Sequence, residues 1–251
     1  MDSKRIYPML GLVVIVLVAG GYWYLSNRPK TPTDIVAYWS FDETEGDIAH
    51  DNIGDNDAIV YGATWIDGKV NGALSFDGRD DRVKLHESTI SGTTVSICLW
   101  VKTDDTFFAL LSGANSTYDN ELLLSVHSSA DGRLSHLYHD NIGIHGDRYY
   151  RTEVTFNDDS WHMLTVVIET DGTMVYLDGV LEEDNDYGSD EGFMIEGLWI
   201  GGDQDSVDGD WGASQQYSGV VDELAIFDRV LTPEEIEQFY NWGLDGIGYY
   251  G

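Results

Sequence analysis

From residue 34 onward, hydrophobic residues recur in short alternating or continuous runs that are separated by Gly, Asp and Asn. Short apolar runs with turn residues between them are typical of antiparallel β-strands. The predicted strands cover residues 35–39, 73–76, 95–101, 121–126, 163–169, 174–177, 198–201 and 219–227. Asp171-Gly172 joins two of these runs and predicts a tight hairpin. Many short strands with regular turns predict an all-β fold, a sandwich or a barrel.

A single segment near the C-terminus has helical spacing. Thr232 followed by Pro233 and Glu235 is the pattern of a helix N-cap with a capping box. Apolar residues then recur on one side of the predicted helix as far as Gly243, which is a typical helix end. One face of this helix should therefore pack on the β-structure. The closing residues 246–251 are predicted to be a flexible tail.

The first 26 residues are predicted to be a membrane anchor. Residues 6–25 carry no charge, and a helix of about twenty residues at about 1.5 Å each spans the hydrocarbon core of a bilayer. The aromatic residues 22–24 that end the run favour an anchor in the cell membrane, with the C-terminal domain outside. The alternative is a cleaved signal peptide, because small residues stand at 18–21, and the protein would then be secreted. Residues 27–33 are a predicted linker, and 34–251 form the predicted sandwich domain.

The chain of 251 residues carries 45 acidic against 13 basic residues, a formal net charge of −32. This excess excludes nucleic acid as a partner, because its phosphates would be repelled. The charge favours bound cations, and it is typical both of proteins from high-salt environments and of ordinary acidic extracellular proteins. Cys98 is the single cysteine, so no intrachain disulfide forms, and its apolar surroundings predict a buried hydrophobic residue.

Two distant polar segments concentrate oxygen atoms in their side chains. The residues concerned are Asp119, Asn120, Asp203, Gln204, Asp205 and Gln215. Carboxylate, carboxamide and backbone carbonyl oxygens are the ligands that Ca²⁺ prefers in proteins. A calcium site is therefore predicted if the fold brings the two segments together. The alternatives are an ordinary turn at the first segment and a solvated acidic loop at the second.

Several motifs occur together in the order found in one family. They lie at residues 38–42, 62–65, 68–74, 76–81, 161–162, 175–179, 222–227 and 231–236. With these motifs the chain resembles the laminin G-like, concanavalin A-like superfamily. The resemblance implies an antiparallel two-sheet jelly-roll sandwich with one short helix. In this superfamily an acid on the last strand can bind a separate structural calcium or cap strand ends. The resemblance makes Asp42 and Asp222 the candidates for this role.

The last third of the chain is similar to the pentraxins, which bind two neighbouring calcium ions on one sheet face and hold their ligand through them. The resemblance implies a first ion bound by Asp119, Asn120, Asp203, Asp205 and the backbone carbonyl of Gln204. It implies a second ion bound by Asp203, Asp205 and Gln215. The chain departs from the pentraxin pattern in having Asp203 in place of glutamate. Leu164 stands at the position of the second pentraxin cysteine, and an oligomer is left open.

The function predicted from these features is calcium-dependent binding of a carbohydrate or a phosphate-bearing ligand at the cell surface. Trp211, inside the acidic loop, is the predicted residue for ligand stacking. The alternative is a structural or adhesive surface subunit that binds no small ligand. A glycoside hydrolase is disfavoured, because it needs two carboxylates in one groove. Asp222 and Glu223 are adjacent in a predicted strand and should point to opposite faces.

Overall fold

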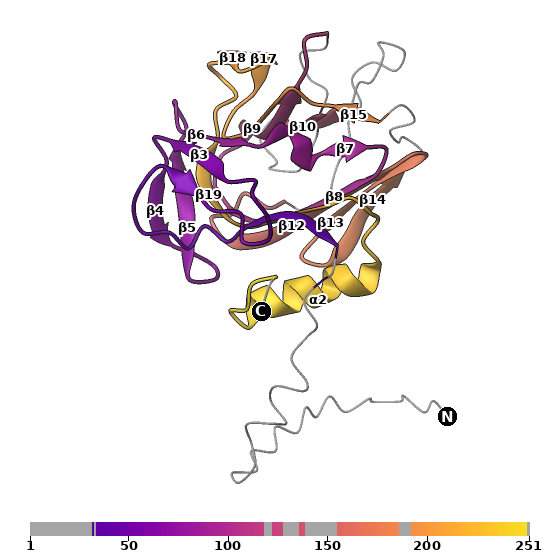
Figure 1. Ribbon diagram of the computed structural model, residues 1–251. Helices are drawn as coiled ribbons and strands as arrows, with labels where there is room; N and C mark the ends of the chain where they lie inside the picture. The colour runs from indigo at the N-terminus through magenta and orange to yellow at the C-terminus, as the bar shows by residue number, and fades with distance from the viewer. Residues whose placement is uncertain are drawn as a thin grey trace, which may run out of the picture. The chain divides into compact units, whose positions relative to one another are not determined.

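The computed structural model describes residues 32, 34–117, 122–127, 136–138, 155–185 and 192–249. These residues belong to one compact unit that begins at Pro32. Two antiparallel sheets pack face to face, and the one α-helix found among these residues lies outside one of them (Figure 1). The prediction of an all-β sandwich with one short helix is confirmed.

The first sheet has eight strands in the order β14-β13-β12-β8-β19-β5-β4, with β1 also paired to β19. Its strands are β1 (Ile35–Trp39), β4 (Thr64–Asp67), β5 (Gly72–Asp77), β8 (Val95–Lys102), β12 (Trp161–Glu169), β13 (Gly172–Leu177), β14 (Val180–Asn185) and β19 (Ser218–Phe227). The residue opposite Cys98 on β12 is Thr165, whose hydroxyl donates to the Cys98 sulfur at 3.4 Å. Leu164 packs in the inner core instead, so it does not face Cys98.

The second sheet has seven strands in the order β11-β10-β9-β16-β6-β3-β2. Its strands are β2 (Ile48–Ala49), β3 (Ala58–Tyr61), β6 (Arg82–Leu85), β9 (Phe107–Ala114), β10 (Leu122–His127), β11 (His136–Tyr138) and β16 (Gly197–Ile200). The smaller elements are β7 (Ser91–Gly92) paired with β15 (Phe193–Met194), the hairpin of β17 (Gln204–Ser206) and β18 (Gly209–Trp211), and the 3₁₀-helix η1 (Glu87–Thr89).

Alternation of side chains along the strands builds the core. On β3, Ala58 and Val60 are buried between the sheets, whereas Ile59 and Tyr61 are exposed on the outer face. Strand β8 is different, because seven of its eight residues are buried. Its inner face packs on the second sheet, and its outer face is covered by the helix. This double burial explains why its sequence reads as one continuous apolar run.

The helix α2 (Pro233–Leu244) begins as the sequence predicts. The hydroxyl of Thr232 accepts a hydrogen bond from Glu235 N, and the Glu235 carboxylate accepts one from Thr232 N. Ile236, Phe239 and Trp242 are buried against the outer face of the eight-stranded sheet. The helix thus closes a second hydrophobic layer outside the sandwich core.

The prediction of a flexible tail is wrong for residues 246–249. Tyr249 is buried, and its backbone N–H donates to the Glu223 carboxylate at 3.2 Å. Its ring lies 5.2 Å from that of Phe239 and 5.9 Å from that of Tyr38. A short glycine-rich end is ordered here because its aromatic residue fills a gap between the helix and the sheet.

Among the described residues, no helix is both long enough and apolar enough to cross a membrane. The predicted anchor, residues 6–25, lies outside the described residues. It therefore stays a prediction from the sequence.

Candidate functional site

The hairpin β17–β18 lies on the side of the sandwich opposite to α2 (Figure 1). Gln204 attaches it to the seven-stranded sheet: the amide nitrogen Nε2 donates to the carbonyls of Ser112 and Gly197, each at 2.9 Å. The amide oxygen Oε1 accepts from Asp208 N at 3.0 Å. The side chain of Gln204 is fully buried and holds the hairpin in place. It is therefore a positioning group, and the predicted role of Gln204 in calcium binding concerns its backbone carbonyl alone.

The fold brings together two of the predicted calcium ligands, Asp203 and Gln215. The amide Nε2 of Gln215 donates to the Asp203 carboxylate at 2.8 Å. Asp203 is buried, and a hydrogen bond from Ala109 N to the Gln215 carbonyl ties that residue to β9. Asp205 is exposed and lies on β17, two residues after Asp203 in the chain.

Asp119 and Asn120 lie outside the described residues. Ala114, the last residue of β9, pairs with Gly197, whose carbonyl accepts from Gln204. The strand that precedes Asp119 in sequence therefore ends beside the hairpin. The complete ligand set stays a prediction.

Trp211 belongs to a group of four neighbouring side chains on the outer face of the seven-stranded sheet. We call this group the platform; its members are Tyr61, Arg82, Trp199 and Trp211. The guanidinium of Arg82 lies over the Trp211 ring, 4.0 Å from its centre. The ring centres of Trp199 and Trp211 lie 5.0 Å apart in an edge-to-face arrangement. The ring centres of Trp199 and Tyr61 lie 5.5 Å apart. The sequence reasoning singled out Trp211 but missed the other three, although alternation along β3 and β6 predicts that Tyr61 and Arg82 face outward.

A pair of buried acids, Asp222 and Glu223, lies on the outer side of the eight-stranded sheet. Asp222 is paired with Trp100, and Glu223 follows it in a bulge of β19 with a φ of 53°. The bulge puts both carboxylates on the outer side, so the prediction that they point to opposite faces is wrong. Strict alternation fails here because the bulge inserts one extra residue into β19.

Hydrogen bonds occupy one oxygen of each of these carboxylates. Asp222 Oδ2 accepts from the backbone N–H groups of Lys69 and Val70 at 2.8 and 2.9 Å. Glu223 Oε2 accepts from the Tyr38 hydroxyl at 2.7 Å. The other oxygens, Asp222 Oδ1 and Glu223 Oε1, are buried and have no hydrogen-bond partner among the described residues.

Burial and the neighbouring charge of Glu223 raise the pKa of Asp222 to about 8. Burial also raises the pKa of Glu223 to about 8, and the charge of Asp42 adds to this effect. Two buried oxygens without donors, with the Asp42 carboxylate close by, fit either bound protons or a cation. The candidates Asp42 and Asp222 thus interact electrostatically, and Glu223 is a third acid that the sequence did not predict. The ligand atoms of these three described acids do not all lie within 4.8 Å of one another.

Residues 77–237 match the family described as the concanavalin A-like lectin/glucanases superfamily. The chain belongs to this superfamily. The match confirms the resemblance that the motifs predicted. A comparison with curated proteins finds no match.

Solved structures similar to this concanavalin A-like chain show the same fold. A heptameric SAP-like pentraxin from Limulus polyphemus has a TM-score of 0.58 and 19% identity over 67% of this chain and 81% of its own. Domain 4 of an extracellular arabinanase from Geobacillus stearothermophilus, in complex with arabinotriose, has a TM-score of 0.62 and 19% identity over 82% and 97%. A Trypanosoma rangeli sialidase in complex with sialic acid has a TM-score of 0.66 and 18% identity over 87% of this chain, which spans 34% of the sialidase chain.

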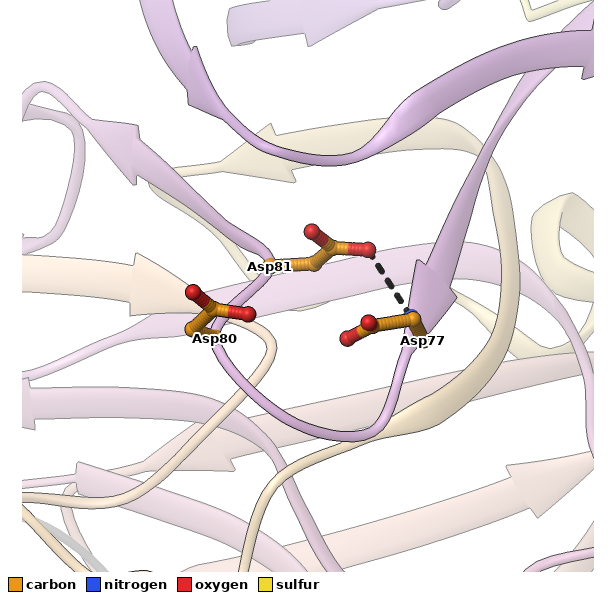
Figure 2. A group of neighbouring side chains, drawn as sticks. All are labelled: Asp77, Asp80 and Asp81. Atoms are coloured by element: carbon orange, nitrogen blue, oxygen red, sulfur yellow. Dashed lines mark hydrogen bonds between the residues drawn. The ribbon is translucent and has the colours of Figure 1, made fainter.

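This concanavalin A-like sandwich also has an acidic turn between β5 and β6. The ligand atoms of Asp77, Asp80 and Asp81 lie within 4.8 Å of one another (Figure 2), the one such group of three acids among the described residues. Asp81 accepts from Asp77 N at 2.9 Å, and Asp77 accepts from Arg79 N at 2.9 Å. These hydrogen bonds close the turn, so the carboxylates of Asp77 and Asp81 have a structural role.

Proposed function

We propose that this protein is a non-catalytic module that binds carbohydrate in a calcium-dependent manner at the hairpin β17–β18. The observation that carries the proposal is the contact between the buried carboxylate of Asp203 and the amide of Gln215. Their oxygens, with exposed Asp205, form part of a hard-oxygen ligand set of the kind that Ca²⁺ needs. Asp119 and Asn120 would complete the set.

Calcium would give so acidic a chain a way to hold oxygen-rich ligands. A bound calcium ion would offer coordination positions to sugar hydroxyl or phosphate oxygens and would offset the local negative charge. The buried side chain of Gln204 fixes the hairpin on the sheet by its two hydrogen bonds. A neighbour that was solved with arabinotriose supports carbohydrate as the ligand class.

Binding is proposed over hydrolysis because of where the paired acids lie. Asp222 and Glu223 are 0% and 1% exposed, and each is hydrogen-bonded to protein groups. A substrate would have no access to them. For these residues, with Asp42, we propose a structural role in which a cation or protons neutralise the buried carboxylates.

Binding of the full chain to a panel of immobilised neutral glycans and phosphocholine, in calcium and in chelator, tests the proposal. We expect the chain to bind glycan in calcium and to lose this binding in chelator. Asp203→Asn should lower the affinity for glycan about tenfold or more, because the loss of a charged ligand should weaken binding of the ion by over about 1.4 kcal/mol. Asp104→Asn, an exposed site with the same charge change, should bind like the wild type. Product analysis of the same glycans should find no cleavage.

Three results would contradict the proposal: equal binding in chelator, cleavage of a glycan, or binding of phosphocholine alone. The last would make a phosphate-bearing compound the ligand. Thermal melting separates the two calcium candidates. Asp222→Asn should reduce any stabilisation by calcium and leave glycan binding intact, since a structural ion acts through folding.

A further inference from the structure

Two of the few basic residues stand side by side on one face. The chain has 13 Lys and Arg against 45 acids, yet Arg82 and Lys84 are two residues apart on β6 and therefore face the same way. Lys84 is neutralised by Asp208 at 2.5 Å. Arg82 instead donates to the neutral Gln216 amide oxygen at 2.6 Å. Among the described residues, no carboxylate forms an ion pair with Arg82, and its buried Nε has no hydrogen-bond partner.

The guanidinium of Arg82 is held in a fixed position. It lies over the ring of Trp211, and Trp211 is packed in turn on Trp199. Trp199 is itself anchored by a hydrogen bond from its Nε1 to Asp208 at 2.9 Å. A stacked guanidinium that is already oriented loses little side-chain entropy when it binds a ligand.

An open aromatic ring stands directly beside this cation. Tyr61 is opposite Arg82 in the β3–β6 ladder, so the two side chains share the outer face. Tyr61 is 46% exposed, whereas Trp199 is 7% exposed and one face of Trp211 is taken by Arg82. Tyr61 is therefore the most exposed of the three rings and the first candidate for stacking.

The platform also adjoins the predicted calcium ligands. Gln216, which accepts from Arg82, donates through its own amide nitrogen to the Gly212 carbonyl at 2.6 Å. Gly212 N donates in turn to the Asp203 carbonyl at 3.1 Å. One short chain of hydrogen bonds thus joins Arg82 to the residue at the centre of the proposed binding site.

We propose that the platform selects an acidic glycan, with Tyr61 stacking on a sugar ring and Arg82 binding the carboxylate of that sugar. A guanidinium presents two parallel N–H donors that match a carboxylate, and an aromatic face accommodates the apolar side of a pyranose. The inference rests on the proposed function, since it names the class of carbohydrate bound at that face. Stacking alone would serve a neutral sugar. Asp80 and Asp81 act on Arg82 only from a distance. The guanidinium, which no carboxylate among the described residues contacts as an ion pair, is what favours a carboxylated sugar.

Calorimetry on the full chain tests the inference with two matched pairs of short probes. The pairs are trigalacturonate with its methyl ester, and sialyllactose with lactose. We expect at least one acidic probe to bind about tenfold or more tighter than its neutral partner, the usual value of a charge-assisted hydrogen bond. Arg82→Gln should abolish that preference, and Tyr61→Ala should weaken binding of the acidic probe.

Arg79→Gln is the matched control, because it removes the same charge from the exposed turn and should leave the preference unchanged. Arg82→Lys keeps the charge but not the paired donors, so it should recover only part of the preference. Equal binding within both pairs, or a preference that survives Arg82→Gln, would overturn the inference.

A repeat of the titrations in chelator separates the two proposals. Binding that needs calcium but not Arg82 would leave the proposed function standing and refute the platform. A preference for the acidic probe that persists in chelator and needs Arg82 would support the platform and refute calcium dependence.

Discussion

Single buried polar side chains decide much of how this chain is built. Gln204 lies in a sequence segment that is typical of a metal-binding loop. Its side-chain amide nevertheless donates hydrogen bonds to two backbone carbonyls of the sheet. Asp222 and Glu223 are carboxylates with one satisfied oxygen each and pKa values raised by burial. Their chemistry follows from the surroundings of the side chain and not from the residue type.

His162 shows the same dependence at the start of β12. Its ring nitrogens lie 2.8 Å from Asp178 Oδ2 and 3.2 Å from Asp158 Oδ1. The hydrogen bond to Asp178 raises the pKa of His162 above its usual 6.5, against the opposing effect of burial. A raised pKa means that the stabilisation is fully present below about pH 6.5 and is lost as the pH rises through the folded value.

We therefore predict that His162 and Asp178 are coupled more strongly at acidic than at alkaline pH. A double-mutant cycle with His162→Gln and Asp178→Asn, followed by urea unfolding, measures the coupling free energy. It should be at most about 1 kcal/mol at pH 5.5, because the pair is partly solvated, and smaller at pH 8.5. The Asp178→Asn substitution keeps a side-chain oxygen as acceptor for Met163 N, and asparagine tolerates the φ of 53° at this position. A coupling that is unchanged between the two pH values would contradict this assignment.

At the scale of elements, some features follow from the local sequence and others from tertiary contacts. Strand β19 is recognisable from its apolar run, but its bulge is not. The bulge turns Glu223 toward Tyr38 and Tyr249 and so creates the buried acidic group. Helix α2, in contrast, is specified by its own first turn, and the Glu235 carboxylate is further held by two hydrogen bonds from Arg229 at 2.8 and 2.7 Å.

The cap of α2 should be measurable by itself. Thr232→Ala removes the hydroxyl that accepts from Glu235 N, and we expect it to lower the free energy of unfolding by about 1 kcal/mol. Thr232→Ser keeps that acceptor and is the matched control, with a change of only a few tenths of a kcal/mol. Chemical denaturation at equilibrium gives both values. An equal loss in the two variants would mean that the hydroxyl does not cap the helix.

At the scale of the whole molecule, the chain combines a formal net charge of −32 with a sandwich that has a hydrophobic core. The charge keeps the surface soluble and repels the phosphates of nucleic acid. The uncharged residues 6–25 are the opposite kind of sequence. We propose that they hold the protein in the cell membrane with the acidic sandwich outside, where calcium and glycans are available.

Fractionation of cells that express the full chain tests this placement. We expect the chain to resist carbonate extraction from membranes, and the sandwich to be digested by protease added to intact cells. A chain that starts at residue 27 should lose membrane association, because the apolar span is gone. Recovery of the full-length product in the medium with a new N-terminus inside residues 1–26 would identify a cleaved signal peptide instead.

The sequence by itself determined the class of fold, most strands, the helix with its cap, and the superfamily. These features rest on periodicity and turn chemistry, which act between near neighbours in the chain. It also placed Asp203 and Gln215 in one candidate site, as spacing and resemblance allowed.

The tertiary structure alone decided which groups actually meet. It buried the Gln204 amide, docked Tyr249, turned Asp222 and Glu223 to one side, and gathered the platform from β3, β6, β16 and β18. Such contacts depend on strand register and on bulges, and a shift of one residue reverses the face of every side chain. Short-range patterns carry little information about register between distant strands. For this reason the residues we propose for ligand selection, Tyr61 and Arg82, emerged only from the folded sheet.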